Sequence, residues 1–147
     1  MTIEVSVFSD HQQCSPGWYR GGRFCYLINT EKKFTWFRSK VECRDRLATL
    51  AMFSSIEEFE TMRSIIPTIS NNVPVLHVGF RYQDAYLQWL DGRYLNKIEF
   101  KNASDFKGYA EGGGIIVTST GERILTNYER SRIGGYVCQL EHGNFIS

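Results

Sequence analysis

The sequence predicts an α+β domain in which two helices and short antiparallel strands are held together by disulfide bonds. Three observations favour this class. Two segments with helical spacing of apolar residues lie between residues 36 and 66, and β-rich runs separated by turn residues follow from residue 75. Four cysteines, at positions 14, 25, 43 and 138, are spread along the chain without the spacing of a zinc site.

Composition limits the classes of function. At 147 residues the chain is expected to form one domain. Its 17 basic side chains nearly balance 16 acidic ones, so no long-range field favours nucleic acid or an anionic membrane. No apolar run approaches the roughly 18 residues of a membrane span, and Met1–Val5 lacks the pattern of a secretory signal. The protein is therefore either intracellular or a segment of a longer exported precursor.

The cysteines favour the exported precursor. An even count without a Cys-x-x-Cys pair suits two disulfides, and we expect the pairs Cys14–Cys25 and Cys43–Cys138. Cys14 and Cys25 flank Gly21-Gly22, as in a hairpin that is stapled near its open end. Four reduced, buried cysteines in a cytosolic protein remain the alternative at this point.

The N-terminal part is predicted to contain an edge strand, a hairpin and a helix. Val5–Phe8 could add an edge strand, and Trp18–Ile28 has aromatic residues on either side of a glycine pair, which is typical of a hairpin. Thr35 is a plausible N-cap for a helix over Trp36–Arg46. The buried face of this helix is expected to carry residues at helical spacing, Trp36, Lys40, Cys43 and Leu47, with Phe37 and Val41 beside them.

The second helix is predicted to begin at Ser55, after a short link or strand over Leu47–Leu50. Glu58, three residues after Ser55, would complete a capping box. The inner stripe of this helix is expected to consist of Phe59, Met62, Arg63 and Ile66, and Ile66-Pro67 should end it.

The rest of the chain is organised around the stretch from Val78 to Asp91, which ends in the turn Trp89-Leu90-Asp91-Gly92. Val75–Phe80 and Tyr86–Leu90 read as two central strands joined at Gln83-Asp84 and closed by an Asp-Gly turn. His77 lies in an apolar run and is expected to be a buried, hydrogen-bonded histidine.

Beyond residue 92 the pattern loosens. Gly112-Gly113-Gly114 is interpreted as a turn or bulge. Ile115–Thr118, Arg123–Thr126 and Gly135–Leu140 are predicted strands, and Tyr109, Ile115 and Ile116 are the expected anchors of the preceding irregular segment.

The chain resembles a C-type lectin-like domain in its long form, with the extra N-terminal hairpin. The resemblance runs in order from Cys14 to Cys138. The motifs that carry it are Cys14-x-x-Gly17-Trp18 with Phe24-Cys25-Tyr26, Trp36 with Cys43 and Leu47-Ala48, Ser54-Ser55-x-Glu57-Glu58, His77-Val78-Gly79-Phe80, Trp89-Leu90-Asp91-Gly92 and Tyr136-Val137-Cys138-Gln139. It implies two helices flanking two small antiparallel sheets, with a long loop projecting from the second sheet. We expect an N-terminal extension at 1–13, the domain at 14–140 and a tail at 141–147.

The sequence departs from this family where calcium-dependent members bind sugar. Those members place two carboxylate or amide side chains around a cis-proline in the long loop, followed by Trp-Asn-Asp on the next strand, and calcium requires six to eight such oxygens. All three prolines here, the last being Pro74, precede the loop. Leu125-Thr126-Asn127 occupies the Trp-Asn-Asp position. The family's further disulfide, which closes the loop, also has no cysteines here. We therefore expect no metal and no cofactor.

A basic and aromatic cluster is the candidate binding surface. Its members lie in or after the long loop and suit interface contacts: Tyr109, Glu111, Arg123, Asn127, Tyr128, Arg130 and Arg132. A solvated strand edge protected by charge is the alternative interpretation. Asn102-Ala103-Ser104 is an acceptor sequon for N-glycosylation.

Two functional classes follow, and neither is an enzyme, because no catalytic constellation is found. The first is an extracellular, calcium-independent recognition module, secreted or part of a membrane protein's ectodomain, that binds a protein ligand or receptor through its long-loop face. The second is a lectin that uses a non-standard site for anionic sugars. The resemblance is also compatible with a homodimer.

Overall fold

The computed structural model describes residues 14–66, 75–96, 100, 106, 110–118 and 122–141. The strand predicted at Val5–Phe8 and the proline predicted to end the second helix lie outside these residues. The described elements, in chain order, are β1 (Tyr19–Gly21), β2 (Phe24–Phe34), α2 (Trp36–Asp45), β3 (Thr49–Leu50), α3 (Ile56–Arg63), β4 (Val75–Gln83), β5 (Tyr86–Trp89), β6 (Gly112–Val117), β7 (Arg123–Tyr128) and β8 (Gly134–Glu141).

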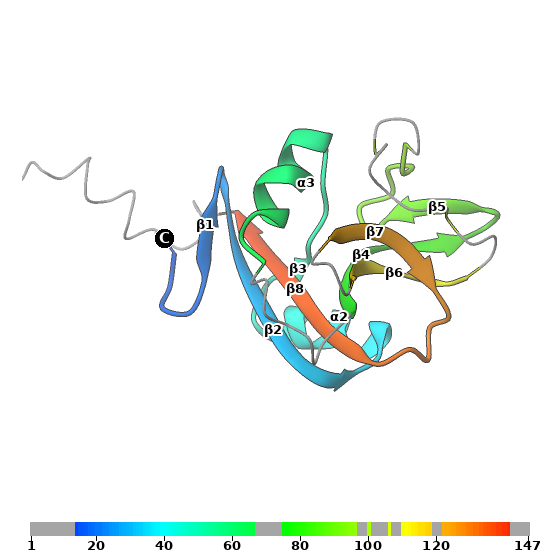
Figure 1. Ribbon diagram of the computed structural model, residues 1–147, viewed down its shortest axis with the longest axis horizontal. Helices are drawn as coiled ribbons and strands as arrows, with labels where there is room; N and C mark the ends of the chain where they lie inside the picture. Colours follow the sequence, from blue (N-terminus) through cyan, green and yellow to red (C-terminus); the bar gives the residue numbers. More distant parts are fainter. Residues whose placement is uncertain are drawn as a thin grey trace, which may run out of the picture.

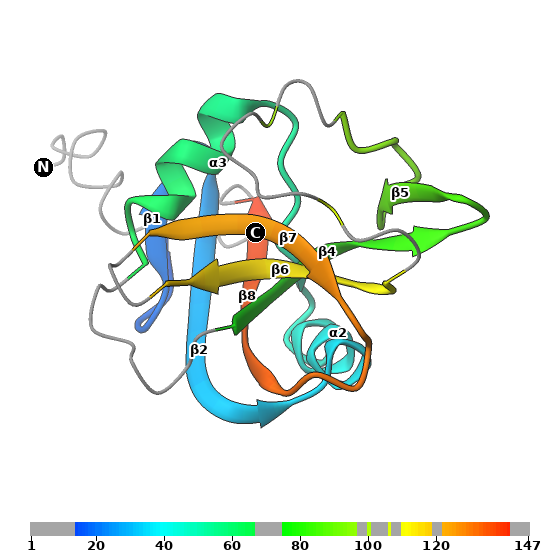
Figure 2. The same ribbon diagram turned by 45° about the vertical axis from the view of Figure 1, so that its right-hand side comes forward.

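The strands form two antiparallel groups, as expected, but hydrogen bonds join the groups into one mixed sheet. The order along the main path is β1-β2-β8-β4-β6-β7, with β3 on β8 and β5 on β4. The junction is a short parallel pairing of β4 with β8, in which Leu76 faces Gly135 and His77 faces Tyr136. Figure 2 shows β6 and β7 running across the direction of β2. The predicted central strand β4 therefore connects both groups.

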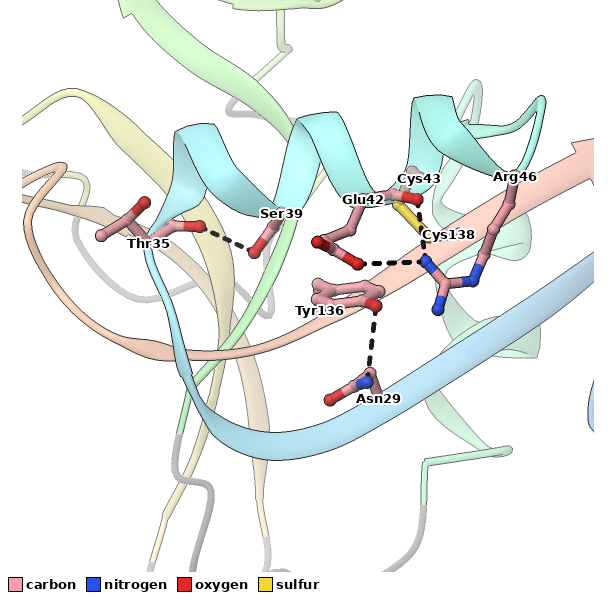
Figure 3. The surroundings of a disulfide bond; sticks show 8 residues. All are labelled: Asn29, Thr35, Ser39, Glu42, Cys43, Arg46, Tyr136 and Cys138. Atoms are coloured by element: carbon pink, nitrogen blue, oxygen red, sulfur yellow. Dashed lines mark hydrogen bonds and ion pairs between the residues drawn. A yellow bond between two sulfur atoms is a disulfide. The ribbon is translucent and has the colours of Figure 1, made fainter.

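Helix α2 begins where the sequence predicts and is covalently attached to β8. The Thr35 hydroxyl accepts a hydrogen bond from the Arg38 amide, which caps the helix. Cys43, on the buried face, forms a disulfide with Cys138 of β8, and Cys14 pairs with Cys25 at the N-terminal hairpin. This is the pairing expected from the sequence. Figure 3 shows the Cys43–Cys138 bridge between the helix and β8, and Figure 1 shows α2 toward the start of β8 and α3 toward its end.

The prediction that Leu47 lies on the buried stripe of α2 is wrong. Leu47 is 87% exposed and has a φ of 60°. The Leu47 amide donates to the Arg44 carbonyl, and the Ala48 amide donates to the Cys43 carbonyl, which is the pattern of a Schellman motif. Leu47 occupies the left-handed position of this motif, so its side chain points away from the core.

Helix α3 is shorter than predicted and is capped in a modified way. The Ser55 hydroxyl accepts from the Glu58 amide, as expected, but Glu58 Oε1 accepts from the amide of Ser54 rather than of Ser55. Phe59 and Met62 are fully buried, whereas the Arg63 guanidinium lies over the Phe59 ring at 5.3 Å and pairs with a neighbouring glutamate. Arg63 therefore covers the stripe instead of belonging to it.

The β4–β5 hairpin and its closing turn agree with the sequence prediction. Gln83 faces Tyr86 across the strands, and the two residues between them, Asp84 and Ala85, have φ of 53° and 70°. Two positive φ values define the turn type whose twist matches that of the strands. Gly92, with a φ of 95°, closes the following turn through its amide to the Trp89 carbonyl.

The three consecutive glycines do not form a turn. They are the first half of β6. The pairing of β6 with β4 shifts register between His77 and Arg81, which is an irregularity of the bulge kind that the sequence predicts. The reason is packing: a Cβ on Gly113 would collide with the Phe80 backbone and ring, and a Cβ on Gly114 would collide with the Tyr128 hydroxyl. Glycine therefore permits β6 to approach these buried rings closely.

The core contains a chain of aromatic contacts that includes two residues of the irregular segment. Phe100, 3% exposed, packs against Phe59 and Trp89 with ring centroids 6.0 Å apart in both pairs. Phe106 packs on Phe80 at 6.1 Å. The expected anchor Tyr109 lies outside the described residues, so Phe100 and Phe106 are the aromatic anchors that the structure identifies in this segment.

Candidate functional site

The strand position that carries calcium ligands in the resembled family is buried here. Leu125 and Asn127 are fully buried and Thr126 is 2% exposed. The Asn127 side-chain amide donates a hydrogen bond of 2.8 Å to the Ala110 carbonyl, which ties β7 to the segment preceding β6. Among the described residues, no group of three His, Cys, Asp or Glu side chains could hold a metal ion. The structure therefore places Asn127, a predicted ligand-contacting residue, in the interior, where its side-chain amide bonds to the backbone.

Tyr128 is likewise part of the interior rather than of a surface cluster. It is 2% exposed, and its hydroxyl lies 2.8 Å from His77 Nδ1 and 3.2 Å from the Gly113 carbonyl oxygen. His77, fully buried, donates from Nε2 to the Phe34 carbonyl at 2.8 Å, because a carbonyl oxygen can only accept. In the neutral ring Nδ1 therefore accepts from Tyr128. The prediction of a satisfied, buried histidine is confirmed.

Burial shifts the pKa values of both groups in the network. Desolvation lowers the pKa of His77 to about 4, against the opposing effect of its hydrogen bond to Phe34. Desolvation also raises the pKa of Tyr128 well above its ordinary value, although the nearby Arg132 acts in the other direction. The Arg132 guanidinium lies over the Tyr128 ring at 5.7 Å. Both members of the network are therefore uncharged at neutral pH.

The His77 network predicts an acid-sensitive stability. A histidine whose folded pKa of about 4 lies below its unfolded value of 6.5 stabilises the fold fully above pH 6.5. This contribution declines as the pH falls from 6.5 towards 4. At pH 5 the expected loss is about 2 kcal/mol relative to pH 8. Urea unfolding at both pH values, for the wild type and His77→Asn, measures it.

His11 and His142 remain in both proteins, so their titration cancels in this comparison. The wild type should lose about 2 kcal/mol more than the variant between pH 8 and pH 5. Equal losses in the two proteins would show that protonation of His77 does not oppose folding.

The three candidate arginines do not form one cluster. Arg123 opens β7, whereas Arg130 follows its end, so the two are separated by about 20 Å of extended chain. Arg123 lines a pocket of about 370 Å³ with Arg63, Glu122 and Ile124, and its buried Nε has no hydrogen-bond partner among the residues that the structure describes. Arg132 covers Tyr128. The arginines of the predicted basic cluster therefore lie at separate places, because the extended strand β7 separates residues that are close in the sequence.

Glu111 and Arg130 are two candidates that the fold brings together at the surface. Arg130 Nε lies 3.1 Å from Glu111 Oε1, with the two side chains 75% and 51% exposed. They border a pocket of about 220 Å³. The other residues that line it come from the start of α2 and the end of β4: Trp36, Phe37, Arg81 and Tyr82. We call this the Glu111–Arg130 pocket and regard it as the candidate functional site.

The residues of α2 and β4 in this pocket were not predicted. Phe37 is 64% exposed, although the sequence places it beside an apolar helix stripe. A signal was present, because Trp36 and Phe37 are adjacent on a helix and cannot both face the same core. The indole nitrogen of Trp36 donates to the Val78 carbonyl at 2.8 Å, which fixes Trp36 inward and Phe37 outward. Tyr109 and the sequon residue Asn102 lie outside the described residues.

No protein-family model matches the chain. Two relatives resemble it at 24% identity: rat C-type lectin domain family 2 member D6, over 95% of this chain, and mouse C-type lectin domain family 12 member B, over 90%. The chain spans 58% and 45% of the lengths of these relatives, or about half. In the described part of the chain, no helix is long and apolar enough to cross a membrane.

Solved structures with the same fold cover most of the chain. The C-type lectin domain of murine dendritic cell inhibitory receptor 2, in complex with N-glycan, has a TM-score of 0.71 and 20% identity over 87% of this chain and 98% of its own. The calcium-independent C-type lectin SPL-2 from Saxidomus purpuratus has a TM-score of 0.75 and 18% identity over 88% of this chain and 95% of its own. The two disulfides and the likeness to these solved structures together show that the chain has the C-type lectin-like fold.

Proposed function

We propose that this chain is a calcium-independent recognition module that binds a protein ligand outside the cell. The observation that carries the calcium independence is the burial of Asn127, whose side-chain amide is already bonded to the Ala110 carbonyl at 2.8 Å. A ligand amide would have to leave this interior position to reach an ion. The calcium-independent lectin SPL-2 has the same fold, so the fold is compatible with this proposal.

The proposed binding surface is the face formed by the long loop. The Glu111–Arg130 pocket is the part of this surface that the structure describes. Phe37 and Arg130 there are exposed and of types that contribute strongly to protein interfaces. The two disulfides suit an oxidising compartment, which supports an extracellular location. These features favour a binding module.

A glycan-binding lectin is the second candidate. Its support is the shared fold with the murine receptor domain that was crystallised with N-glycan. Within this chain, Arg63 and Arg123 both line the pocket of about 370 Å³, and their guanidinium groups would suit an anionic sugar. The protein-binding reading is preferred because the Glu111–Arg130 pocket includes exposed aromatic surface.

The two candidates are separated by probing arrays of cell-surface ectodomains and of glycans with the tetramerised domain, each with calcium or with chelator. The proposal expects binding to a protein ectodomain that chelator does not change. Arg130→Glu should weaken that binding about tenfold or more, whereas Lys32→Glu, on the exposed edge of β2, should not. Chelator-sensitive glycan binding without any ectodomain binding would overturn the proposal.

A further inference from the structure

A second pocket lies beside the Glu111–Arg130 pocket and continues it along α2. Its volume is about 240 Å³, and Arg81 lines both pockets. The side chains of Lys40 and Arg44 border it from α2, and Leu90 borders it from the turn after β5. We call the combined surface of Phe37, Lys40, Arg44, Arg81 and Leu90 the α2–β4 groove.

The α2–β4 groove is positively charged because its cations have no carboxylate partners in the part of the chain that the structure describes. Lys40, Arg44 and Arg81 line the second pocket, and no acidic residue lines it. Within the described ranges, none of these three forms a salt bridge, whereas the cations that do are Arg23, Lys33, Arg38, Arg46, Arg63, Arg93 and Arg130. Since the whole chain carries a net charge of only +1, this concentration of unneutralised charge is local. A negatively charged group would bind there without displacing an internal ion pair.

The groove also exposes apolar surface next to the charges. Phe37 is 64% exposed, and the Lys40 ammonium lies 5.9 Å from the centre of its ring. The Arg81 guanidinium lies 5.9 Å from the ring of Trp36, so it is held beside an aromatic face. The rest of the lining of the second pocket comes from Ala48, Thr49, Leu50 and Leu90.

The dimensions of the groove suit a short stretch of extended chain. Phe37 and Arg44 are two turns apart on α2, which corresponds to about 10 Å along the helix axis. An extended peptide covers this length with about three residues. Alternating side chains of such a peptide would meet the aromatic end at Phe37 and the cationic end at Arg44.

We propose that the α2–β4 groove binds an acidic segment of a partner protein. One carboxylate lies among Lys40, Arg44 and Arg81, and an apolar side chain two residues away in the segment packs on Phe37. This inference rests on the proposed function in taking the ligand to be a protein, and it adds the chemistry of the bound segment. The exposed Phe37 ring favours a peptide over a sulfated sugar, because a peptide can present carboxylate and hydrocarbon groups together.

The experiment titrates the isotopically labelled domain with three ligands and follows backbone amide NMR shifts. The ligands are an acetylated peptide that repeats Leu-Ser-Glu-Ser, so that Leu and Glu lie on one face of an extended chain, the same peptide with Gln in place of Glu, and a heparin-derived hexasaccharide. The Glu peptide should shift the amides of Phe37–Arg44 and Arg81, and the Gln peptide should bind at least tenfold more weakly. Lys40→Gln/Arg81→Gln should weaken Glu-peptide binding about tenfold.

Lys32→Gln/Lys33→Gln removes the same charge from the exposed part of β2 and is the matched control, which should bind as the wild type does. If both double variants bind the Glu peptide equally weakly, the net charge of the domain would explain the weakening, and the groove assignment would be overturned. Shifts at the groove with heparin and none with the Glu peptide would overturn the partner class and also count against a protein ligand. No shift at the groove with any ligand would overturn this inference alone, since the proposed function concerns the long-loop face.

Discussion

Replacing both Cys43 and Cys138 with alanine is expected to lower the free energy of unfolding by about 4 to 5 kcal/mol. The bridge closes a segment with a sequence separation of 95 residues, and the loop-entropy model assigns about 4.7 kcal/mol to a loop of that size. It also joins α2 to β8, and both sulfur atoms belong to fully buried residues. A domain of this size is typically stable by about 5 to 15 kcal/mol, so much of the stability would be lost.

The measurement is urea unfolding followed by tryptophan fluorescence, with Cys14→Ala/Cys25→Ala as the control. That bridge has a sequence separation of only 11 residues, so its removal should cost less, about 3 kcal/mol. Loss of a cooperative transition in the Cys43/Cys138 variant, with the transition retained in the control, agrees with the prediction. A loss below about 1 kcal/mol would show that packing alone holds α2 on the sheet.

Gly114→Ala is expected to destabilise the fold by about 3 kcal/mol, at the upper end of the usual cost of overpacking. A Cβ at this position would overlap the Tyr128 hydroxyl and would lie 2.8 Å from the Leu76 carbonyl oxygen. Tyr128 has little freedom to move, because it is buried and its hydroxyl is bonded to His77. The substitution therefore disturbs the junction of β4, β6 and β7 at once.

Gly112→Ala is the matched control, since its Cβ would meet Trp36 Cβ at 3.3 Å, a contact that a small shift relieves. We expect it to cost about 1 kcal/mol or less. Combining Gly114→Ala with Tyr128→Phe removes the clashing hydroxyl, so the double variant should lose less stability than the sum of the single losses. Strict additivity in chemical denaturation would contradict this account of the glycine.

The sequence correctly predicted the elements that are determined by neighbouring residues, such as capped helix ends and a hairpin turn. Thr35 and Ser55 cap helices through their own hydroxyl groups, and the strands on either side of Gln83-Asp84 follow from alternation and a turn. Gly112-Gly113-Gly114 was misinterpreted because glycine usually marks a turn. Here Gly113 and Gly114 are needed because a side chain would collide with Phe80 or Tyr128. Those rings are distant in the sequence, so the residues around the glycines do not indicate the contact with them.

The candidate site was predicted less well than the fold for a similar reason. β7 is covered on both faces over Leu125–Tyr128, and a sequence cannot show that Asn127 points to a carbonyl of the preceding segment. Glu111 and Arg130 were found because both lie near the predicted loop face. The cations of the α2–β4 groove come from α2 and β4, and it is the fold that places these elements side by side.

The most direct test of calcium-independent recognition is a calorimetric titration of the chelator-treated domain with calcium. The titration should reach the millimolar range in which extracellular calcium modules bind. We predict no heat beyond dilution and an unchanged melting temperature, because Asn127 is committed to the interior. A saturable heat accompanied by a rise in melting temperature, both abolished by Asn127→Ala, would contradict the account.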